Sequence, residues 1–490
     1  MQNEITELRN QVRTLKRIVY GFGCVLFAGV VVSATSLQTV PDVIQVKRFE
    51  VVNSNSNAVV KIEFSDAGQS PDDDGTQADA SPPQHAPLPP VVDAQSLTGK
   101  LMFGYQGWFG AQGDGSAFNR WRHWSPQIEP TPDHITVDMW PDLREFDDDE
   151  LFQTGFRYDS GEPAHLFSSS VQKTVHRHFD WMREHGLDGV FLQQFVCELR
   201  AGSVMRSVRD QVMTHVASGA RRSGRIFALM YDISGSDAEL LVEQIKAHWR
   251  AAVDQGVVGQ GRYLNHNGRP LVALWGFGFL RRPGSAAQAS ALVNWFHHEA
   301  PVNYQATVMG GVPTHWRTLD GDAKADPAWR GYYSSLDIIS PWTVGRFADD
   351  GGLNHHVRHF IEPDLIAAHR IGADYLPVVW PGFSWSNLRP EAQINQIPRR
   401  GGRFWWSQFH RYTEAGAGMI YVAMFDEVDE GTAMFKIAEN SRQTPAAGRF
   451  VTLDADGEAL PSDWYLRLAG VATRVLRGDR AASASRPINP

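Results

Sequence analysis

The chain has 490 residues, of which 42% are hydrophobic and 21% are charged, as in an ordinary globular protein. This length exceeds one minimal domain and suits a single large α/β barrel with insertions and an additional segment. The formal net charge of −9 argues against a nucleic-acid partner, which needs clustered lysine and arginine, and two cysteines are too few for a disulfide framework.

The first 38 residues have the pattern of a membrane anchor. Residues 19–37 are uncharged and mostly apolar, long enough to cross a bilayer as a helix, and three basic residues stand just before them. We expect residues 18–38 to be an uncleaved transmembrane signal anchor, with the rest of the chain on the extracytoplasmic side. The alternative is a secreted protein whose signal peptide is cleaved.

The residues before this apolar stretch favour the anchor. Apolar side chains in residues 1–17 follow 3-4-3-4 spacing, which predicts a short cytoplasmic helix with a coiled-coil seam. A signal peptide does not need such a seam. Membrane contact through the anchor and oligomerisation through residues 1–17 are therefore the partner predictions for this end of the chain.

Three further segments follow from composition. Alternating apolar residues over 43–64 surround a run of Asn and Ser, which predicts a small β-hairpin module. Residues 65–90 are rich in Pro and Asp and poor in apolar residues, as expected of a disordered linker. The main domain should cover 91–480, followed by a tail over 481–490.

Eight short apolar runs in the main domain alternate with helix-like stretches. Alternating strands and helices imply parallel βαβ units, and eight such units close a (β/α)8 TIM barrel. An open doubly wound sheet is the alternative, but the glycines of 104–110 lack the spacing of its phosphate-binding turn. The predicted strands are 101–106, 189–195, 226–232, 271–275, 306–312, 336–342, 375–380 and 419–426.

Polar and aromatic residues stand at the carboxyl ends of these runs, where a barrel of this kind places its site. Sugar rings present apolar C–H faces that stack on flat aromatic side chains, so the tryptophans are candidate sugar platforms. The candidate substrate-binding residues are Tyr105, Gln106, Trp108, Gln193, Tyr231, Asp232, Trp275, His315, Trp342, Arg346, Trp380, Trp385 and Asp426.

The eighth run ends in four acidic residues within five positions, 426–430. Burial of these groups without partners would cost several kcal/mol, so they must face a polar cavity, a cation or solvent. Glu427 and Glu430, at i and i+3, can project to the same side, and glycoside cleavage needs one neutral and one ionised carboxyl group. The alternatives are a solvated acidic loop and a cation site built from Asp426, Asp429 and Glu430.

The sequence also resembles a known family. The run 426–432, Asp-Glu-Val-Asp-Glu-Gly-Thr, is similar to the Asn-Glu-Trp-His-Glu-Gly-Thr signature of glycoside hydrolase family 99, the endo-α-mannosidases, and of the broader 71/99-like group. Segments 104–109, 341–346 and 381–385 resemble that branch, whose members are often labelled xylosidase or arabinosidase. The resemblance spans roughly 101–477.

What the resemblance implies is a retaining mechanism in which the 2-hydroxyl of the sugar attacks the anomeric carbon. By position, Glu427 matches the base toward that hydroxyl, and Glu430 matches the general acid, which later acts as the base for water. Asp426 stands where the signature has Asn, and Val428-Asp429 stand where it has Trp-His, so the resemblance leaves the sugar specificity open.

We therefore expect a glycoside hydrolase that acts on a poly- or oligosaccharide and uses no cofactor or metal. Two alternatives stay open. The barrel could bind carbohydrate without turnover, or it could be a metal-dependent hydrolase that uses the cluster from Asp426 to Glu430 as ligands.

Overall fold

The computed structural model describes residues 48–52, 58–63, 90–259 and 261–490. These residues belong to two units, the first within 1–84 and the second within 85–490. In the first unit, β1 (Arg48–Val52) pairs antiparallel with β2 (Ala58–Glu63), at the position where the alternation predicts a hairpin.

The predictions for the N-terminal helix (1–17), the anchor (18–38) and nearly all of the linker (65–90) lie outside the described residues and stay predictions. Among the helices of the described ranges, none is both long enough and apolar enough to cross a bilayer.

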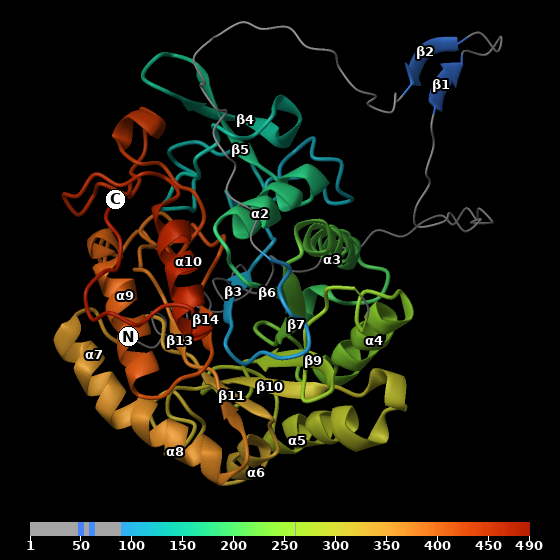
Figure 1. Cartoon of the computed structure of the whole chain (residues 1–490), viewed down its shortest axis with the longest axis vertical. Helices are drawn as coiled ribbons and strands as arrows, with labels where there is room; N and C mark the ends of the chain where they lie inside the picture. The colour runs from blue at the N-terminus through green and yellow to red at the C-terminus, as the bar shows by residue number, and fades with distance from the viewer. Residues whose placement is uncertain (1–47, 53–57, 64–89, 260) are drawn as a thin grey trace, which may run out of the picture. The chain divides into compact units, whose positions relative to one another are not determined.

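A parallel sheet forms the centre of the second unit, and a strand lies at each of the eight predicted positions (Figure 1). The strands are β3 (Leu101–Tyr105), β6 (Gly189–Phe195), β7 (Ile226–Asp232), β9 (Arg269–Trp275), β10 (Thr307–Val312), β11 (Ile338–Pro341), the pair β12 (Asp374–Tyr375) and β13 (Val378–Val379), and β14 (Ile420–Val422). Both faces of the central strands are buried, as expected of a parallel sheet covered by helices.

The seventh position joins the two ends of this sheet. β12 pairs with β11, and β13, two residues further along, pairs with β14, which pairs with β3. Between them, Leu376 N–H donates to Ile339 O (2.9 Å), and Pro377 O accepts from Tyr421 N–H (3.0 Å). One segment therefore changes hydrogen-bonding partner at Pro377, and the sheet closes as in a TIM-like fold. The alternative of an open doubly wound sheet is wrong.

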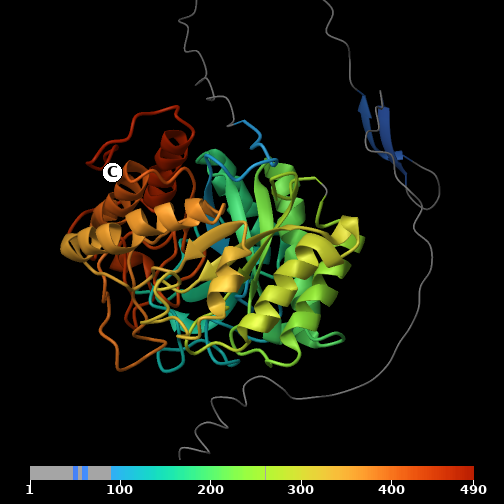
Figure 2. The same cartoon turned by 90° about the horizontal axis from the view of Figure 1, so that it is seen from below.

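Helices follow the strands in the chain and lie around the outside of the sheet (Figures 1 and 2). They begin and end at residues suited to those positions. The N-cap of α3, Ser203, accepts from Arg206 N–H, and α3 ends at Gly224 with a φ of 70°. The helices are α2 (Gln172–Glu184), α3 (Val204–Ser223), α4 (Leu241–Asp254), α5 (Ala286–Asn294), α6 (Trp329–Ser334), α7 (Asp350–His356), α8 (Glu362–Arg370), α9 (Arg403–Glu414) and α10 (Trp464–Leu476).

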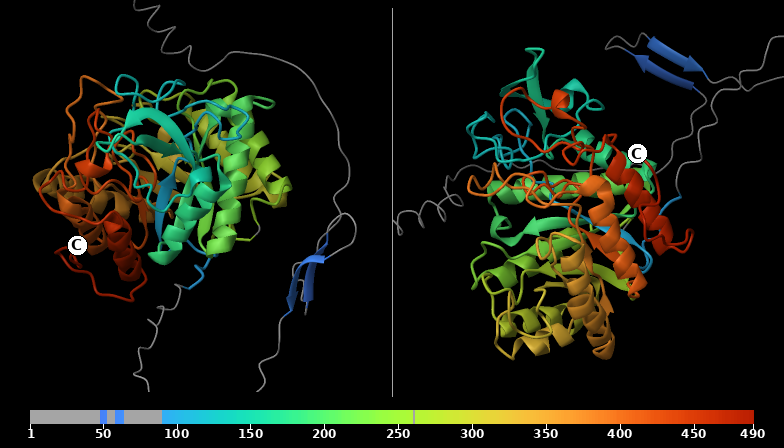
Figure 3. Two further views of the ribbon diagram at one scale, coloured as in Figure 1. Left: turned by 90° about the horizontal axis from the view of Figure 1, so that it is seen from above. Right: turned by 90° about the vertical axis from the view of Figure 1, so that its left-hand side faces the viewer.

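A long excursion between β3 and α2 carries an antiparallel hairpin, β4 (Leu151–Arg157) and β5 (Pro163–Phe167), at the periphery of the unit (Figure 3). The excursion contacts the acidic segment, because the N–H groups of Asp138 and Met139 both donate to Val428 O, at 3.1 and 3.3 Å. It therefore helps to hold the segment that the sequence marks as the site.

Candidate active site

The acidic segment leaves the carboxyl end of β14 as a closed turn. Phe425 N–H donates to Gly104 O (2.7 Å), which ties the start of the turn to β3, and Thr432 N–H donates to Glu427 O (3.1 Å). Gly431 has a φ of 64°, and a Cβ there would lie 2.8 Å from Ser384 N. The Gly that follows the second glutamate is therefore needed both for its backbone conformation and for a close backbone approach.

Asp426 is fully buried and bonds to the backbone of the loop after β3. Its two carboxylate oxygens accept from Gln106 N–H (2.7 Å) and Gly107 N–H (2.9 Å). Burial raises the pKa of Asp426 to about 6, while these two hydrogen bonds act in the opposite direction. Asp426, predicted to bind substrate, thus connects two strand ends and positions the neighbouring residues.

Glu427 is directed toward Gln106, whose Nε2 donates to its Oε2 (2.9 Å). Only 6% of Glu427 is exposed. Burial raises the pKa of Glu427 well above its usual value, repulsion from Glu430 and Asp429 adds to the rise, and the bond from Gln106 opposes it. This environment favours the protonated form of Glu427, most strongly while Glu430 and Asp429 are ionised.

Glu430 is half-buried and forms the more open side of the segment. Burial raises its pKa to about 7, against the opposing charges of Arg282 and Arg389. A carboxyl group with this pKa is protonated in a large fraction of molecules near neutral pH, which is the requirement for a general acid. Ser384 N–H donates to the backbone oxygen of Glu430 (3.0 Å), which packs the loop after β13 against it.

Asp429, between the two glutamates, is directed toward the excursion. Its Oδ2 lies 3.6 Å from Nδ1 of His123. The His123 ring stacks on Trp108, with centroids 3.8 Å apart, and Trp108 also stacks on Phe195 at 5.3 Å. These contacts place Trp108, a predicted substrate-binding residue, next to the acidic segment. His123 also belongs to this site, and the sequence did not indicate it because it lies far from any predicted strand end.

Inside the barrel, several predicted residues meet around Tyr421 of β14. Gln193 Nε2 donates to the Tyr421 hydroxyl (3.2 Å), whose pKa is raised by burial and by the nearby charge of Glu427. The Trp342 ring lies 6.3 Å from the Tyr421 ring, and Trp275 packs edge-on against Trp342 at 5.4 Å. Tyr421 was not predicted, because it lies within the apolar run rather than at its end.

Three predicted aromatic residues face the helices instead. The Tyr105 hydroxyl bonds to His178 of α2 (2.9 Å), and the Tyr231 hydroxyl bonds to His248 of α4 (2.7 Å). Trp380, fully buried, packs its ring against Phe347 and against Phe404 of α9. Successive side chains of a strand point to opposite faces, so each of these residues lies on the outer face of the sheet. Their assignment to sugar binding is corrected to packing between sheet and helices.

The remaining predicted residues lie at other strand ends. Asp232 and Trp385 are half-buried, and Asp232 accepts from Ser234 N–H (2.7 Å). His315 and Arg346 meet at Asp322, which bonds to His315 Nδ1 (2.8 Å) and forms an ion pair with Arg346 (2.5 Å). Asp322 was missed because it lies seven residues beyond the strand-end position of His315.

The acidic segment lacks the convergence of a metal site. Among the described residues, the set of three acidic side chains whose ligand atoms approach within 4.8 Å of one another is Asp147, Asp149 and Glu150, on the excursion. In the acidic segment, both oxygens of Asp426 are bound by backbone N–H groups. Asp426, Asp429 and Glu430 do not form such a set within the described ranges.

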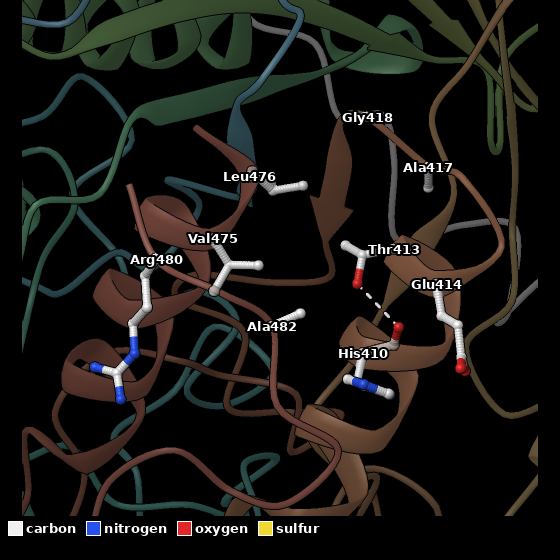
Figure 4. A pocket seen from close by; sticks show the side chains of 9 residues that line it. All are labelled: His410, Thr413, Glu414, Ala417, Gly418, Val475, Leu476, Arg480 and Ala482. Carbon is white, nitrogen blue, oxygen red and sulfur yellow. Dashed lines mark hydrogen bonds between the residues drawn. The ribbon is translucent and has the colours of Figure 1, made fainter. Parts of the chain in front are cut away.

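Two surface pockets lie elsewhere. One, of about 410 Å³, lies between α9 and α10 and is lined by residues such as His410, Gly418 and Leu476 (Figure 4). The other, of about 430 Å³, includes Lys100. Lys100 directly precedes β3 and Gly418 lies two residues before β14, so both pockets are at the amino ends of the strands, opposite the acidic segment.

Comparison with known proteins supports the fold. No protein-family model matches the chain, and neither does any curated protein. Two solved structures of the family 99 endo-α-mannosidase of Bacteroides thetaiotaomicron, one of them in complex with bis-tris-propane, match with a TM-score of 0.57 and 16% identity, over 79% of this chain and 100% of theirs. The chain shares the fold of these structures. This agrees with the resemblance that the run 426–432 indicates.

Proposed function

We propose that this protein is a glycosidase, with Glu427 and Glu430 as its catalytic pair. The observation that carries this proposal is the placement of both carboxyl groups after β14, largely buried, with the pKa of each raised. The carboxyl ends of barrel strands are where such folds assemble active sites. The shared fold and the family 99 resemblance support the same assignment.

The pair can divide the two tasks of glycoside cleavage. When Glu430 holds a proton, the largest repulsion on Glu427 disappears, and the Gln106 side chain stabilises Glu427 as the carboxylate. The pair then has one acid and one base, as two neighbouring carboxyl groups in a buried site require.

We propose the substrate-assisted order of steps. Glu427 takes the proton of the sugar 2-hydroxyl, whose oxygen attacks the anomeric carbon, while the bond to the leaving oxygen breaks and that oxygen takes the proton of Glu430. Water then opens the anhydro sugar at the anomeric carbon, giving its proton to Glu430, while Glu427 returns a proton to the 2-oxygen. Two inversions give net retention. Trp275 and Trp342 are the proposed sugar platforms in this site, with Gln193 as a polar contact.

The test is hydrolysis of a panel of α-mannans, xylans and arabinans. Glu427→Gln and Glu430→Gln should each lower turnover by roughly 10³-fold or more, because each removes a proton acceptor or donor needed in the transition state, while glycan binding persists. Glu391→Gln, a change of the same kind at an exposed position, is the matched control. Activity that survives both catalytic substitutions would contradict the assignment. Binding of a glycan by the parent protein without any release of sugar would instead favour a non-catalytic carbohydrate-binding barrel.

A further inference from the structure

Two arginines beside the acidic segment lack an acidic partner within the described ranges. Arg282, in the loop after β9, has its guanidinium carbon 5.5 Å from the centroid of the Trp275 ring, and its Nε is buried without a hydrogen-bond partner. Arg389 has its guanidinium carbon 5.9 Å from the Trp385 ring. A buried guanidinium N–H without an acceptor is costly, so a ligand that supplies one would bind favourably there.

Other arginines around the strand ends differ in this respect. Arg346 is paired with Asp322, and both Arg122 and Arg209 are paired with Glu198. In those ion pairs the protein itself supplies the carboxylate. Arg399 also lacks an acidic partner, but its guanidinium group donates to the backbone oxygens of Gly431 and Ala433. The guanidinium groups of Arg282 and Arg389 have no acceptor among the described residues.

Both arginines affect Glu430 through their charge, and the loop of Arg389 also contacts its backbone. The loop that carries Arg389 is fixed to it by the hydrogen bond from Ser384 N–H to Glu430 O (3.0 Å), and Arg389 N–H donates to Trp385 O (2.7 Å). Arg282 and Arg389 are also the two positive charges that lower the pKa of Glu430. Since Glu430 is the proposed donor to the leaving oxygen, the two guanidinium groups belong to the leaving-group side of the scissile bond.

We propose that the site accepts an anionic glycan, and that Arg282 and Arg389 bind a carboxylate or sulfate group on the leaving-group sugar. This inference rests on the proposed function for the identity of the ligand as a glycan. A guanidinium group offers paired N–H donors that match the two oxygens of a carboxylate or sulfate.

Binding of an anionic group by the two arginines would also affect the protonation of Glu430. Uncompensated positive charge beside a general acid favours its ionised form and works against proton donation. A bound anion would neutralise that charge and keep Glu430 protonated to higher pH. An anionic substrate should therefore be cleaved over a pH range that extends further to the alkaline side than the range for its neutral counterpart.

The experiment compares matched glycans that differ only in charge. Binding of glucuronoxylan and of the same polymer after reduction of its carboxyl groups is measured by calorimetry with the full chain carrying Glu430→Gln, which prevents turnover. Dextran sulfate and dextran form a second pair that distinguishes sulfate from carboxylate. We expect the anionic member of at least one pair to bind on the order of tenfold more tightly, the effect of one charge-assisted hydrogen bond.

Substitutions then test whether Arg282 and Arg389 cause the tighter binding of the anionic glycan. Arg282→Gln and Arg389→Gln should each reduce it, and Arg282→Lys should keep part of it. Arg250→Gln is the matched control, because Arg250 also lies over a tryptophan, Trp295 at 4.9 Å, but on the outer helix α4. Thermal unfolding confirms that each variant folds, and the exposed Arg389 provides a test that does not depend on the more buried Arg282.

The outcomes separate this inference from the proposed function. Equal binding of both members in both pairs, or an unchanged preference in the Arg282→Gln/Arg389→Gln double variant, would overturn it. Hydrolysis of neutral glycans without any charge preference would reject the anion site alone. A preference that depends on the arginines, in a parent protein that hydrolyses nothing, would support the anion site and reject the glycosidase.

Discussion

At the scale of single residues, Glu430 and Asp426 show how two carboxyl groups of one turn come to lie in different environments. Burial raises the pKa of Glu430 to about 7, whereas the neighbouring Asp426 has both oxygens bound by backbone N–H groups. The two carboxyl groups, four positions apart in one turn, therefore differ because only that of Asp426 accepts hydrogen bonds from the backbone of the loop after β3.

The pKa of Glu430 predicts the pH dependence of activity. In the proposed mechanism the protonated form of Glu430 gives its proton to the leaving oxygen, so kcat/KM should fall as the pH rises through about 7, by about tenfold for each pH unit above it. The measurement is a pH–rate profile from pH 5 to 9 on a glycan hydrolysed by the parent protein. An aryl glycoside whose leaving group needs no protonation is the control and should show a weaker alkaline decline. Constant kcat/KM between pH 6 and 9 on the glycan would contradict the role of Glu430.

At the scale of elements, neighbouring strands determine where the side chains of Trp275 and Tyr421 can lie. Gly311 of β10 pairs with Trp275 of β9, and a Cβ at Gly311 would lie 2.3 Å from Cδ1 of the Trp275 ring. The absence of a side chain on one strand thus allows the indole of the next to lie across it. Gly104 of β3 has a similar role, because a Cβ there would lie 2.3 Å from the Tyr421 hydroxyl.

We predict that Gly311→Ala displaces the Trp275 indole. The expected result is a KM several times higher with a smaller change in kcat, together with a loss of about 1–3 kcal/mol in the free energy of unfolding from overpacking. Steady-state kinetics and urea denaturation measure the two effects. Gly331→Ala in α6, where a Cβ meets nothing within 4 Å, is the control and should leave KM unchanged. An unaltered KM in Gly311→Ala would show that Trp275 does not contact the substrate.

At the scale of the whole barrel unit, the amino ends of the strands hold the closure together. Asp188, fully buried just before β6, accepts from Leu101 N–H at the start of β3 (2.9 Å) and is paired with Arg477 directly after α10. One carboxylate thus connects the first strand, the second strand and the last helix, on the side opposite the acidic segment.

Arg477→Met should therefore destabilise the protein without changing its chemistry. Removal of the cation leaves the Asp188 carboxylate buried and poorly compensated, which should lower the free energy of unfolding by about 3 kcal/mol, while kcat/KM stays close to that of the parent protein at 20 °C. Arg474→Met, at an exposed position in α10, is the control for loss of charge. Equal urea midpoints for the two variants would show that the Asp188 pair contributes nothing to closure.

The sequence by itself determined the eight strand positions and the acidic turn, because these are local patterns. Short apolar runs bounded by polar residues can be read without knowledge of what packs against them. The break in the seventh strand could not be predicted from a local pattern. It depends on the two neighbouring strands, because β12 pairs with β11 and β13 pairs with β14, with the change of partner at Pro377.

Only the tertiary structure decided which strand-end residues enter the site. Gln106 and Tyr105 are adjacent, yet one bonds to Glu427 and the other to His178 of α2. Strand alternation allows either assignment until the register of the barrel is known. His123 reaches Asp429 from a loop distant in sequence, through a contact that the tertiary structure creates. Local patterns thus indicate where catalytic chemistry is available, and long-range packing determines which groups reach it.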